Sequence, residues 1–165
     1  MSLVMFEEAN DIAFVLNGDP VALRVPVRLN LADLIRGTLG KTGTHVGCEH
    51  GVCGACNVML DGRSVRSCLM LAVQADGAQV QTIEGLTQSG AIADLQAEFV
   101  ARNALQCGYC TPGMLATAAE MLNGPKLSRA AIRDGLSGNF CRCTGYHSIV
   151  DAIEAVMDKR AGSPS

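Results

Sequence analysis

The sequence predicts an α+β fold in two parts, a small sheet domain followed by a helical domain. Apolar and polar residues alternate along much of the first part, which is the period of half-buried strands. From Glu84 onward apolar residues recur every three or four positions, which is the period of amphipathic helices. The 8 cysteines also divide equally between the two parts. We therefore expect one domain over residues 1–84 and a second over residues 85–165.

Composition and charge limit the classes of protein to which this chain can belong. The chain has 165 residues, of which 48% are hydrophobic and 18% charged, so it can bury a core. The net charge is -3 and no run rich in Lys or Arg occurs, so nucleic acid is not an expected partner. No apolar run approaches the roughly 18 to 20 residues that span a bilayer. The N-terminus, with Glu7 and Glu8, lacks the features of a secretory signal. We expect a soluble, cytoplasmic protein.

The first domain begins with a hairpin and a short helix. Alternating residues over 12–16 and 21–27 predict two strands, and Asn17-Gly18 between them is a strong turn signal. Asn30 can cap a helix over residues 31–39, because its side chain can accept a hydrogen bond from the first helical turn.

A second hairpin is expected after the first cysteines. Its strands cover residues 57–60 and 64–68, and Asp61-Gly62 forms the turn. This hairpin would place Cys68 on the returning strand, facing the loop that precedes it. A further strand over residues 78–83 completes a mixed sheet of about four or five strands crossed by one helix.

The second domain is predicted to be a four-helix bundle. Thr111-Pro112 favours one helix start and Ser128 another. The expected helices cover residues 92–105, 111–122 and 128–136, with the last starting at 147 or 148. The tail from about residue 161 is expected to be frayed, and residues 82–88 are expected to form the linker.

The cysteines form two quartets with the spacing of metal ligands. The first reads C-x4-C-x2-C with a distant fourth member, which is typical of a plant-type [2Fe-2S] ferredoxin loop, and consists of Cys48, Cys53, Cys56 and Cys68. The second combines C-x2-C with C-x-C and consists of Cys107, Cys110, Cys141 and Cys143. Because disulfides do not persist in a reducing cytosol, metal binding is the better explanation. Two such centres indicate an electron carrier.

Parts of the cysteine pattern also fit other metal and redox sites. A structural zinc ion could use the second quartet, because zinc sites favour short cysteine pairs. Either C-x2-C could be a redox dithiol, although that motif needs no partner quartet. The stretch Cys48-Glu49-His50 mimics half of a Rieske motif, but the required second Cys and His pair is missing among 3 histidines.

The residues around the cysteines suit an anionic cluster. The glycines among the first three cysteines permit a tight loop whose N–H groups approach the sulfurs. The second quartet lies at two helix starts, at Thr111 and near His147, where free N–H groups stabilise negative charge.

Five segments together resemble the iron-sulfur subunit of the molybdenum hydroxylases, the family of xanthine dehydrogenase, aldehyde oxidase and carbon monoxide dehydrogenase. The resemblance covers roughly residues 10 to 158 and is carried by residues 47–56, 67–69, 82–86, 106–114 and 138–146. It implies a β-grasp, ferredoxin-like domain and an α-helical domain, each holding one [2Fe-2S] cluster on its cysteines. It also identifies Gln106 as the glutamine that binds the pterin and Cys143 as the ligand nearest to it.

The resemblance further implies the partners and the task of the chain. A large subunit would hold molybdopterin, as the cytosine dinucleotide, and a medium subunit would hold FAD, in a dimer of heterotrimers. Electrons would pass from molybdenum through both clusters to FAD, and the substrate, an N-heteroaromatic compound, would be hydroxylated in another chain. The alternatives are the small subunit of a carbon monoxide dehydrogenase and a free-standing two-cluster electron shuttle. Tyr109 and Phe140 are expected to pack around a cluster, and no role is assigned to His45 or His50.

Overall fold

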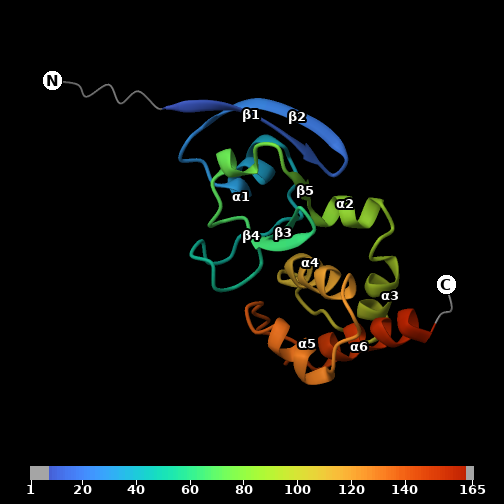
Figure 1. The fold of residues 1–165 in the computed structure, drawn as a ribbon. Helices are drawn as coiled ribbons and strands as arrows, with labels where there is room; N and C mark the ends of the chain where they lie inside the picture. Colours follow the sequence, from blue (N-terminus) through green and yellow to red (C-terminus); the bar gives the residue numbers. More distant parts are fainter. Residues whose placement is uncertain (1–7, 163–165) are drawn as a thin grey trace.

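A computed structural model describes residues 8–162 of the chain (Figure 1). One mixed sheet has the strand order β2-β1-β5-β3-β4. Neighbouring strands pair antiparallel except β1 and β5, which are parallel. The strands are β1 (Ala9–Leu16), β2 (Asp19–Pro26), β3 (Asn57–Leu60), β4 (Arg63–Arg66) and β5 (Gln79–Gln81). The expected mixed sheet, and with it the α+β class, is confirmed.

Both predicted hairpins are confirmed, and their turns have the backbone that the sequence requires. Asn17 and Gly18 have φ of 54° and 93°, and Asp61 and Gly62 have φ of 48° and 81°. Two consecutive left-handed residues are what a two-residue type I′ turn needs, and Asn-Gly and Asp-Gly tolerate them best.

The placement of Cys68 on a strand was wrong. The β3–β4 ladder ends at the pair Asn57–Arg66, and Cys68 lies in the turn that follows. The chain turns there because the N–H of Leu69 donates to the carbonyl of Arg66 at 3.0 Å. The Ser67 hydroxyl donates to the Cys56 carbonyl at 2.7 Å, which holds this turn against the first cysteine loop.

The predicted short helix crosses the sheet and closes a first core. Helix α1 (Leu31–Asp33) continues as a π-helical turn over Leu34–Thr38, and Asn30 caps it by accepting from the Asp33 N–H at 2.8 Å. The apolar side chains of this segment pack with those of β1 and β5 in a core that includes Ile12, Phe14, Leu31, Leu34, Ile35, Val58 and Val80. A 3-10 turn over Ala72–Ala75, which the sequence did not predict, also contributes to this core.

The four predicted helices are present, with one change in length. They are α3 (Ala93–Ala101), α4 (Thr111–Leu122), α5 (Arg129–Gly135) and α6 (His147–Gly162). Ser128 caps α5 as expected, accepting from the Ala131 N–H at 3.2 Å. Helix α3 stops four residues before the expected Leu105, and Asn103 just beyond it has a φ of 51°.

The structure adds detail at both ends of this domain. The expected linker contains a helix, α2 (Ile83–Gln88), with the acidic Glu84 in its first turn. Helix α6 runs through Gly162, past the expected fraying point at residue 161, and residues 163–165 of that tail lie outside the described residues. Within the described part of the chain, no helix has the length and apolar character needed to cross a membrane.

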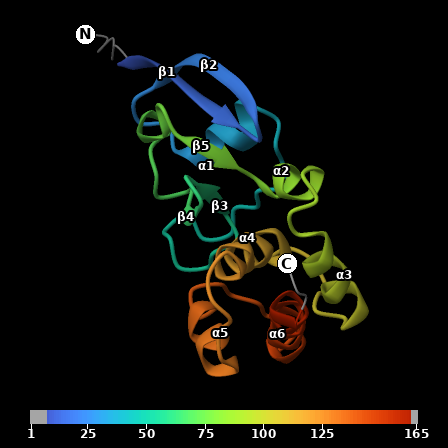
Figure 2. The same ribbon diagram turned by 45° about the vertical axis from the view of Figure 1, so that its right-hand side comes forward.

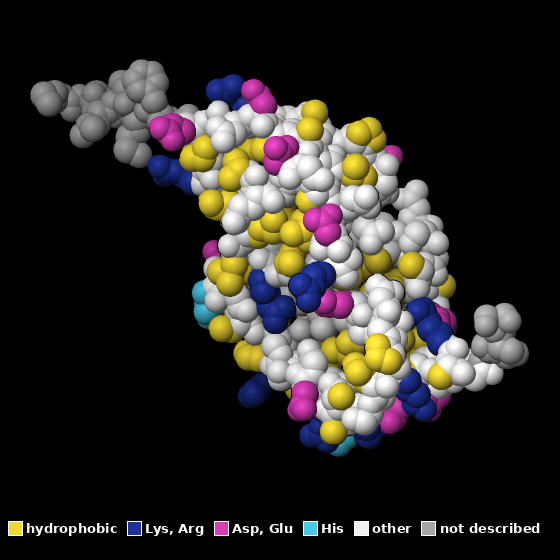
Figure 3. All heavy atoms as spheres, viewed as in Figure 1, with side chains coloured by type: hydrophobic (Ala, Val, Ile, Leu, Met, Phe, Trp, Pro, Cys, Tyr) yellow, Lys and Arg dark blue, Asp and Glu magenta, His cyan; other side chains and the backbone are white. Residues whose placement is uncertain are grey.

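Helix α4 lies between the sheet and the helices α5 and α6 (Figures 1 and 2). It contacts β3 and β4 on one side, while α6 packs against α3 and α5. The arrangement of these helices as a bundle and the domain boundary at residue 84 stay predictions. On the face seen in Figure 3, acidic and basic side chains are interspersed.

Strand β3 serves two cores because successive residues of a strand face opposite sides. Val58 belongs to the core beneath α1, whereas Met59 belongs to the helical core with Phe99, Met114 and Ile153. Both residues are almost completely buried, with 1% and 2% exposed. The sheet and the helices are therefore joined by packed side chains as well as by the chain itself.

Candidate metal centres

The first quartet surrounds a tightly turned loop between the π-helical turn and β3. Glu49, Gly51 and Gly54 have φ of 59°, 84° and 72°, so three residues among the cysteines have the left-handed backbone that is typical of tight turns. The glycines were expected here because they adopt this conformation without strain. Glu49 is the exception that the glycine pattern did not indicate.

The second quartet is built from two chain segments that each precede a helix. Cys110 is the N-cap residue of α4, and Cys141 and Cys143 lie in the irregular segment before α6. Cys107 and Cys143 are exposed, whereas Cys110 and Cys141 are half-buried. One pair of sulfurs of this quartet therefore faces outward and the other faces the protein.

The structure brings both predicted quartets together, and within each the sulfurs meet in pairs. Cys48 contacts Cys53 and Cys56 contacts Cys68 through their side chains. In the second quartet Cys110 contacts Cys141, and the sulfurs of Cys107 and Cys143 are 3.6 Å apart. Electrostatic interactions also cross between the pairs, as from Cys68 to Cys48 and from Cys110 to Cys107.

This pairing fits a two-metal cluster. Two thiolates bound tetrahedrally to one metal at about 2.3 Å lie roughly 3.8 Å apart, close to the Cys107–Cys143 separation. A diiron cluster takes two thiolates on each iron, whereas a single zinc ion needs all four at one point.

Hydrogen bonds to sulfur make the cysteines of the first quartet unequal. Burial raises the pKa of the Cys48 thiol, but hydrogen bonds from the backbone of Cys53 and His50 outweigh it and lower that pKa to about 6. Burial, together with the neighbouring Cys56, raises the pKa of Cys68 to about 11. The protein therefore favours the thiolate at Cys48 and the neutral thiol at Cys68.

The second quartet repeats this inequality with different donors. Burial raises the pKa of Cys141, but the hydroxyl and N–H of Thr144, 3.1 and 3.4 Å from the sulfur, lower it overall. Burial and the neighbouring Cys141 raise the pKa of Cys110 to about 12. Thr144 was part of the motif, but its contact with sulfur was not predicted from the sequence.

Gln106, the predicted pterin ligand, lies beside the exposed pair of sulfurs. Its side-chain amide donates to the backbone carbonyl of Cys143 at 3.0 Å, and the residue is exposed. This bond joins the segment that carries Cys107 to the segment that carries Cys143. Part of the amide remains available at the surface, because a glutamine side chain has two N–H donors and an oxygen acceptor.

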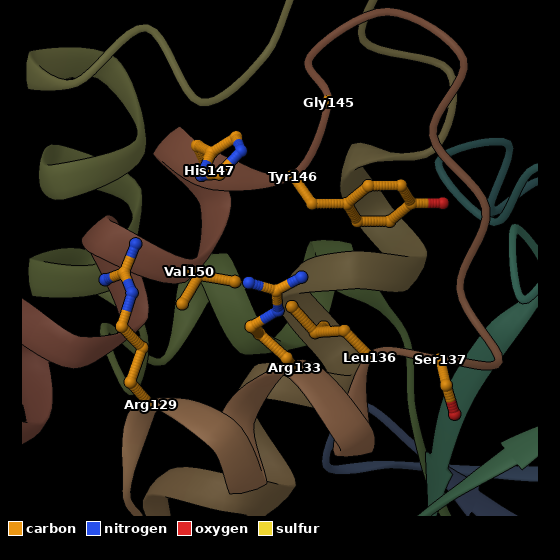
Figure 4. Close-up of a pocket in the computed structure, with 8 residues that line it drawn as sticks. All are labelled: Arg129, Arg133, Leu136, Ser137, Gly145, Tyr146, His147 and Val150. Atoms are coloured by element: carbon orange, nitrogen blue, oxygen red, sulfur yellow. The ribbon is translucent and has the colours of Figure 1, made fainter.

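A cavity of about 230 Å³ lies behind the second quartet, between α5 and the start of α6 (Figure 4). Tyr146 lines it and also accepts a hydrogen bond from the Cys141 N–H at 2.8 Å, so one side chain contacts both the cavity and the backbone of that cysteine. The cavity contains no cysteine and is distinct from the candidate centre. Its lining residues are Arg129, Arg133, Leu136, Ser137, Gly145, Tyr146, His147 and Val150.

The two quartets are adjacent because their loops contact each other. The Phe140 N–H donates to the Cys53 carbonyl at 2.8 Å, which links the residue before Cys141 to the first loop. His45 stacks on Tyr109 with 4.7 Å between ring centroids, and the Tyr109 hydroxyl donates to the Val46 carbonyl at 2.7 Å.

The side chains expected to pack around a cluster lie at the surface of the two loops. Tyr109 is 50% exposed and Phe140 54% exposed, and their packing around a cluster stays a prediction. His45, to which the sequence analysis assigned no role, instead connects the two loops through Tyr109.

Family models match both parts of the chain. A family described as a 2Fe-2S iron-sulfur cluster binding domain matches residues 14–87. A second family, described as a [2Fe-2S] binding domain, matches residues 82–154. Each match contains one complete quartet.

Several characterised proteins are similar over most of their length. The caffeine dehydrogenase subunit gamma of Pseudomonas sp. (strain CBB1) is 48% identical over 149 residues, covering 88% of this chain and 89% of that protein. The nicotine 6-hydroxylase small subunit of Paenarthrobacter nicotinovorans is 46% identical over 144 residues, covering 87% of each. The xanthine dehydrogenase iron-sulfur-binding subunit of Escherichia coli O157:H7 is 39% identical over 149 residues, covering 88% and 93%.

Solved structures share the fold. A chain of quinoline 2-oxidoreductase from Pseudomonas putida 86 superposes with a TM-score of 0.85 at 48% identity, covering 94% of this chain and 99% of that one. The aldehyde oxidoreductase from Desulfovibrio gigas superposes with a TM-score of 0.84 at 40% identity. There the match covers 92% of this chain but 17% of the other, so the similar unit is one part of a longer chain.

Proposed function

Since this chain belongs to the small iron-sulfur subunits of the molybdenum hydroxylases, we propose that its task in such an oxidoreductase is to carry electrons between two partner chains. The observation that carries this proposal is the grouping of all 8 cysteines into two adjacent quartets of paired sulfurs. A mobile ferredoxin needs only the first domain, whereas here the second quartet and Gln106 occupy a complete helical domain.

Each quartet is proposed to hold one [2Fe-2S] cluster. The first would be bound by Cys48, Cys53, Cys56 and Cys68, and the second by Cys107, Cys110, Cys141 and Cys143. When bound, each cluster supplies the transfer of single electrons. The protein's own contribution is to orient the thiolates in pairs and to donate hydrogen bonds to sulfur from the first loop and from Thr144, which stabilises negative charge there.

The exposed edge of the second quartet is proposed to face the large molybdenum subunit. Cys107, Cys143 and Gln106 are all exposed there, and the Gln106 amide is positioned beside the Cys143 carbonyl. An amide suits the edge of a pterin, here proposed to be a cytosine dinucleotide form, because it both donates and accepts hydrogen bonds.

We propose that a medium FAD subunit receives the electrons and that the complex is a dimer of heterotrimers. Two similar proteins are named subunit gamma and small subunit, which supports assembly with other chains. The unpaired state of all 8 cysteines supports a cytoplasmic location, where thiols stay reduced.

An N-heteroaromatic substrate, hydroxylated in another chain, is the proposed reaction of the complex. Caffeine, nicotine and quinoline, named for three similar proteins, are all nitrogen heterocycles. Similarity in this subunit supports the class of substrate only, because the substrate pocket lies outside this chain.

Metal analysis and spectroscopy of anaerobically purified protein test the proposal. We expect about four iron and four sulfide per chain, two of each per cluster, and two distinguishable EPR signals after reduction. Colourless protein that contains zinc would contradict it. Co-purification tests the subunit role: larger chains that remain bound through size exclusion support it, and a chain isolated alone from its native host would favour the free-standing shuttle.

A further inference from the structure

We infer that Arg66 is a positioning residue that holds the two candidate centres in one arrangement. Arg66 is the last residue of β4, and its half-buried guanidinium donates to both cysteine loops. Nε donates to the Gly51 carbonyl at 3.1 Å, and Nη2 donates to the Gly138 carbonyl at 2.6 Å. Gly51 lies between Cys48 and Cys53, and Gly138 lies three residues before Cys141. This inference rests on the proposed function, because it concerns the clusters that the loops would hold.

The shape of the guanidinium makes this bridge rigid. An arginine presents five donors in one plane, so a single side chain can satisfy several acceptors in fixed directions. The third acceptor is the Asn57 side-chain oxygen, to which Nη1 donates at 2.6 Å. A lysine at this position is a point charge and could not reach the three acceptors with the same geometry.

The acceptor Asn57 is itself held by α4. Its amide donates to the Thr117 hydroxyl at 2.7 Å, and that hydroxyl donates to the Gly113 carbonyl at 3.0 Å. The amide of Asn139, next to Gly138, donates to the same Gly113 carbonyl at 3.1 Å. Asn57, Thr117 and Asn139 are buried, with 3%, 8% and 2% exposed. The network therefore fixes Arg66 from the helical domain as well as from the sheet.

Backbone packing leaves the two loops little freedom to rearrange when Arg66 is intact. A Cβ atom on Gly54 would lie 2.7 Å from the Gly138 carbonyl oxygen, so the loops touch without side chains between them. Without Arg66 three acceptors lose their charged donor. Within residues 8–162 the loops stay joined by the Phe140–Cys53 hydrogen bond, by the Asn139 amide, which donates to the Gly54 carbonyl at 3.5 Å, and by the contacts of Tyr109 with His45 and Val46. We therefore expect the relative position of the two quartets to become variable.

The test compares Arg66→Met, Arg66→Lys and Arg63→Met in the assembled complex. Arg63 lies on the same strand, is exposed, and has no side-chain hydrogen bond within residues 8–162, so Arg63→Met removes an equal charge without removing a bridge. The magnetic interaction between the two reduced clusters, measured by EPR, is the main readout, because it depends on their separation and orientation. The rate of electron transfer between the clusters, from rapid reduction, is the second.

We expect Arg66→Met and Arg66→Lys to lose the resolved magnetic interaction while keeping both signals, and to slow transfer by roughly tenfold or more, as for groups that orient metal ligands. Arg63→Met should match the wild type. If Arg66→Met does not fold, Arg66→Lys decides the question, because it retains the charge and most of the volume. A wild-type interaction in Arg66→Lys would overturn the positioning role, since charge alone would then suffice. Absence of two clusters in the wild type would instead refute the proposed function, and this inference with it.

Discussion

Hydrogen bonds to sulfur, more than burial, distinguish the cysteines within each quartet. Cys48 and Cys141 both receive backbone and side-chain donors that lower their pKa, while the half-buried Cys68 and Cys110 lack enough donors to offset burial. Backbone N–H groups need no particular residue type, so such donors are invisible in sequence. Glu49, with its φ of 59°, illustrates this, because its backbone conformation and not its side chain shapes the loop.

Thr117 is the residue whose loss should most directly weaken the polar network between the domains. Thr117→Val keeps the shape of the side chain but leaves a buried Asn57 N–H without its acceptor. Such a change typically lowers the free energy of unfolding by about 1–3 kcal/mol. Urea unfolding of the holoprotein measures this cost. Thr87→Val is the control, because Thr87 is exposed and accepts one surface hydrogen bond from Gln96. Equal unfolding free energies for the two variants would show that the network does not contribute to stability.

At the scale of single residues, the sequence indicated the candidate ligands but not the hydrogen bonds that hold their loops in place. The spacing of the cysteines was sufficient to group them, and the motif placed Gln106 beside the second quartet. The contacts of Arg66 with Gly138 and of Cys53 with Phe140 join residues more than seventy positions apart. Such contacts depend on how the elements pack, and no local period or spacing encodes them.

Elements were predicted well where a cap, a turn or a clear period marked them. Helix α4 begins and ends where Thr111-Pro112 and Asn123 indicated, and Ser128 caps α5. Helix α2 was missed because six residues do not establish a period. The strand assigned to Cys68 failed because Ser67 and Leu69 form hydrogen bonds that draw the chain out of the sheet.

Gly113 allows α4 to approach the first cysteine loop, and Gly113→Ala should therefore be costly. The added Cβ would lie 2.1 Å from the Gly54 carbonyl oxygen. Because the neighbouring atoms belong to the backbone, they cannot move away easily. We therefore expect the free energy of unfolding to fall by about 1–3 kcal/mol or more. Gly135→Ala is the matched helical control, because its Cβ would meet only the flexible end of Met121. Denaturant unfolding compares the two. A milder effect at Gly113 than at Gly135 would contradict the close packing of α4 on this loop.

The pair Asp94 and Arg160 ties α3 to α6 and should make their docking sensitive to acid. The Arg160 guanidinium donates to both Asp94 oxygens at 2.8 Å and lowers the pKa of that carboxyl. Because the folded pKa is the lower one, this contribution is complete above the unfolded value of about 3.9 and disappears as the pH falls through the folded value.

Asp94→Asn should therefore lower the free energy of unfolding at pH 6 by no more than about 1 kcal/mol for so exposed a pair, with a correspondingly lower Tm. The difference from wild type should vanish at low pH. Differential scanning calorimetry of both proteins across this range is the measurement, and acid effects on the cluster sites cancel in the comparison. Asp11→Asn, which alters the more exposed pair with Arg24, serves as control. A difference that persists below the folded pKa would contradict the ion-pair explanation.

For the whole molecule, the sequence predicted an α+β chain with two cysteine quartets, and the structure adds that they are adjacent. Composition and periodicity describe each half separately, so neither could show that the two loops touch. The packing of Met59 with helical residues had no signal either, because an alternating strand does not reveal which core each face enters.

Cys110→Ser tests the link between cluster binding and assembly. Cys110 belongs to the inner pair of the second quartet and packs against the helical core. We expect loss of the second EPR signal, weaker association with the molybdenum subunit and no turnover, because metal sites of this kind also stabilise the fold around them. The first signal serves as the internal control. Normal turnover in this variant would contradict the assignment of the second quartet.

The sharing of β3 between two cores has a consequence for the modularity of the chain. A fragment ending near residue 84 would leave Met59 uncovered and Asn57 without its contact to α4. Such a fragment should aggregate when expressed alone, although it contains every proposed ligand of the first cluster. Neither half can therefore be transferred to another protein by itself. The new protein would also have to supply the surface that covers Met59 and contacts Asn57.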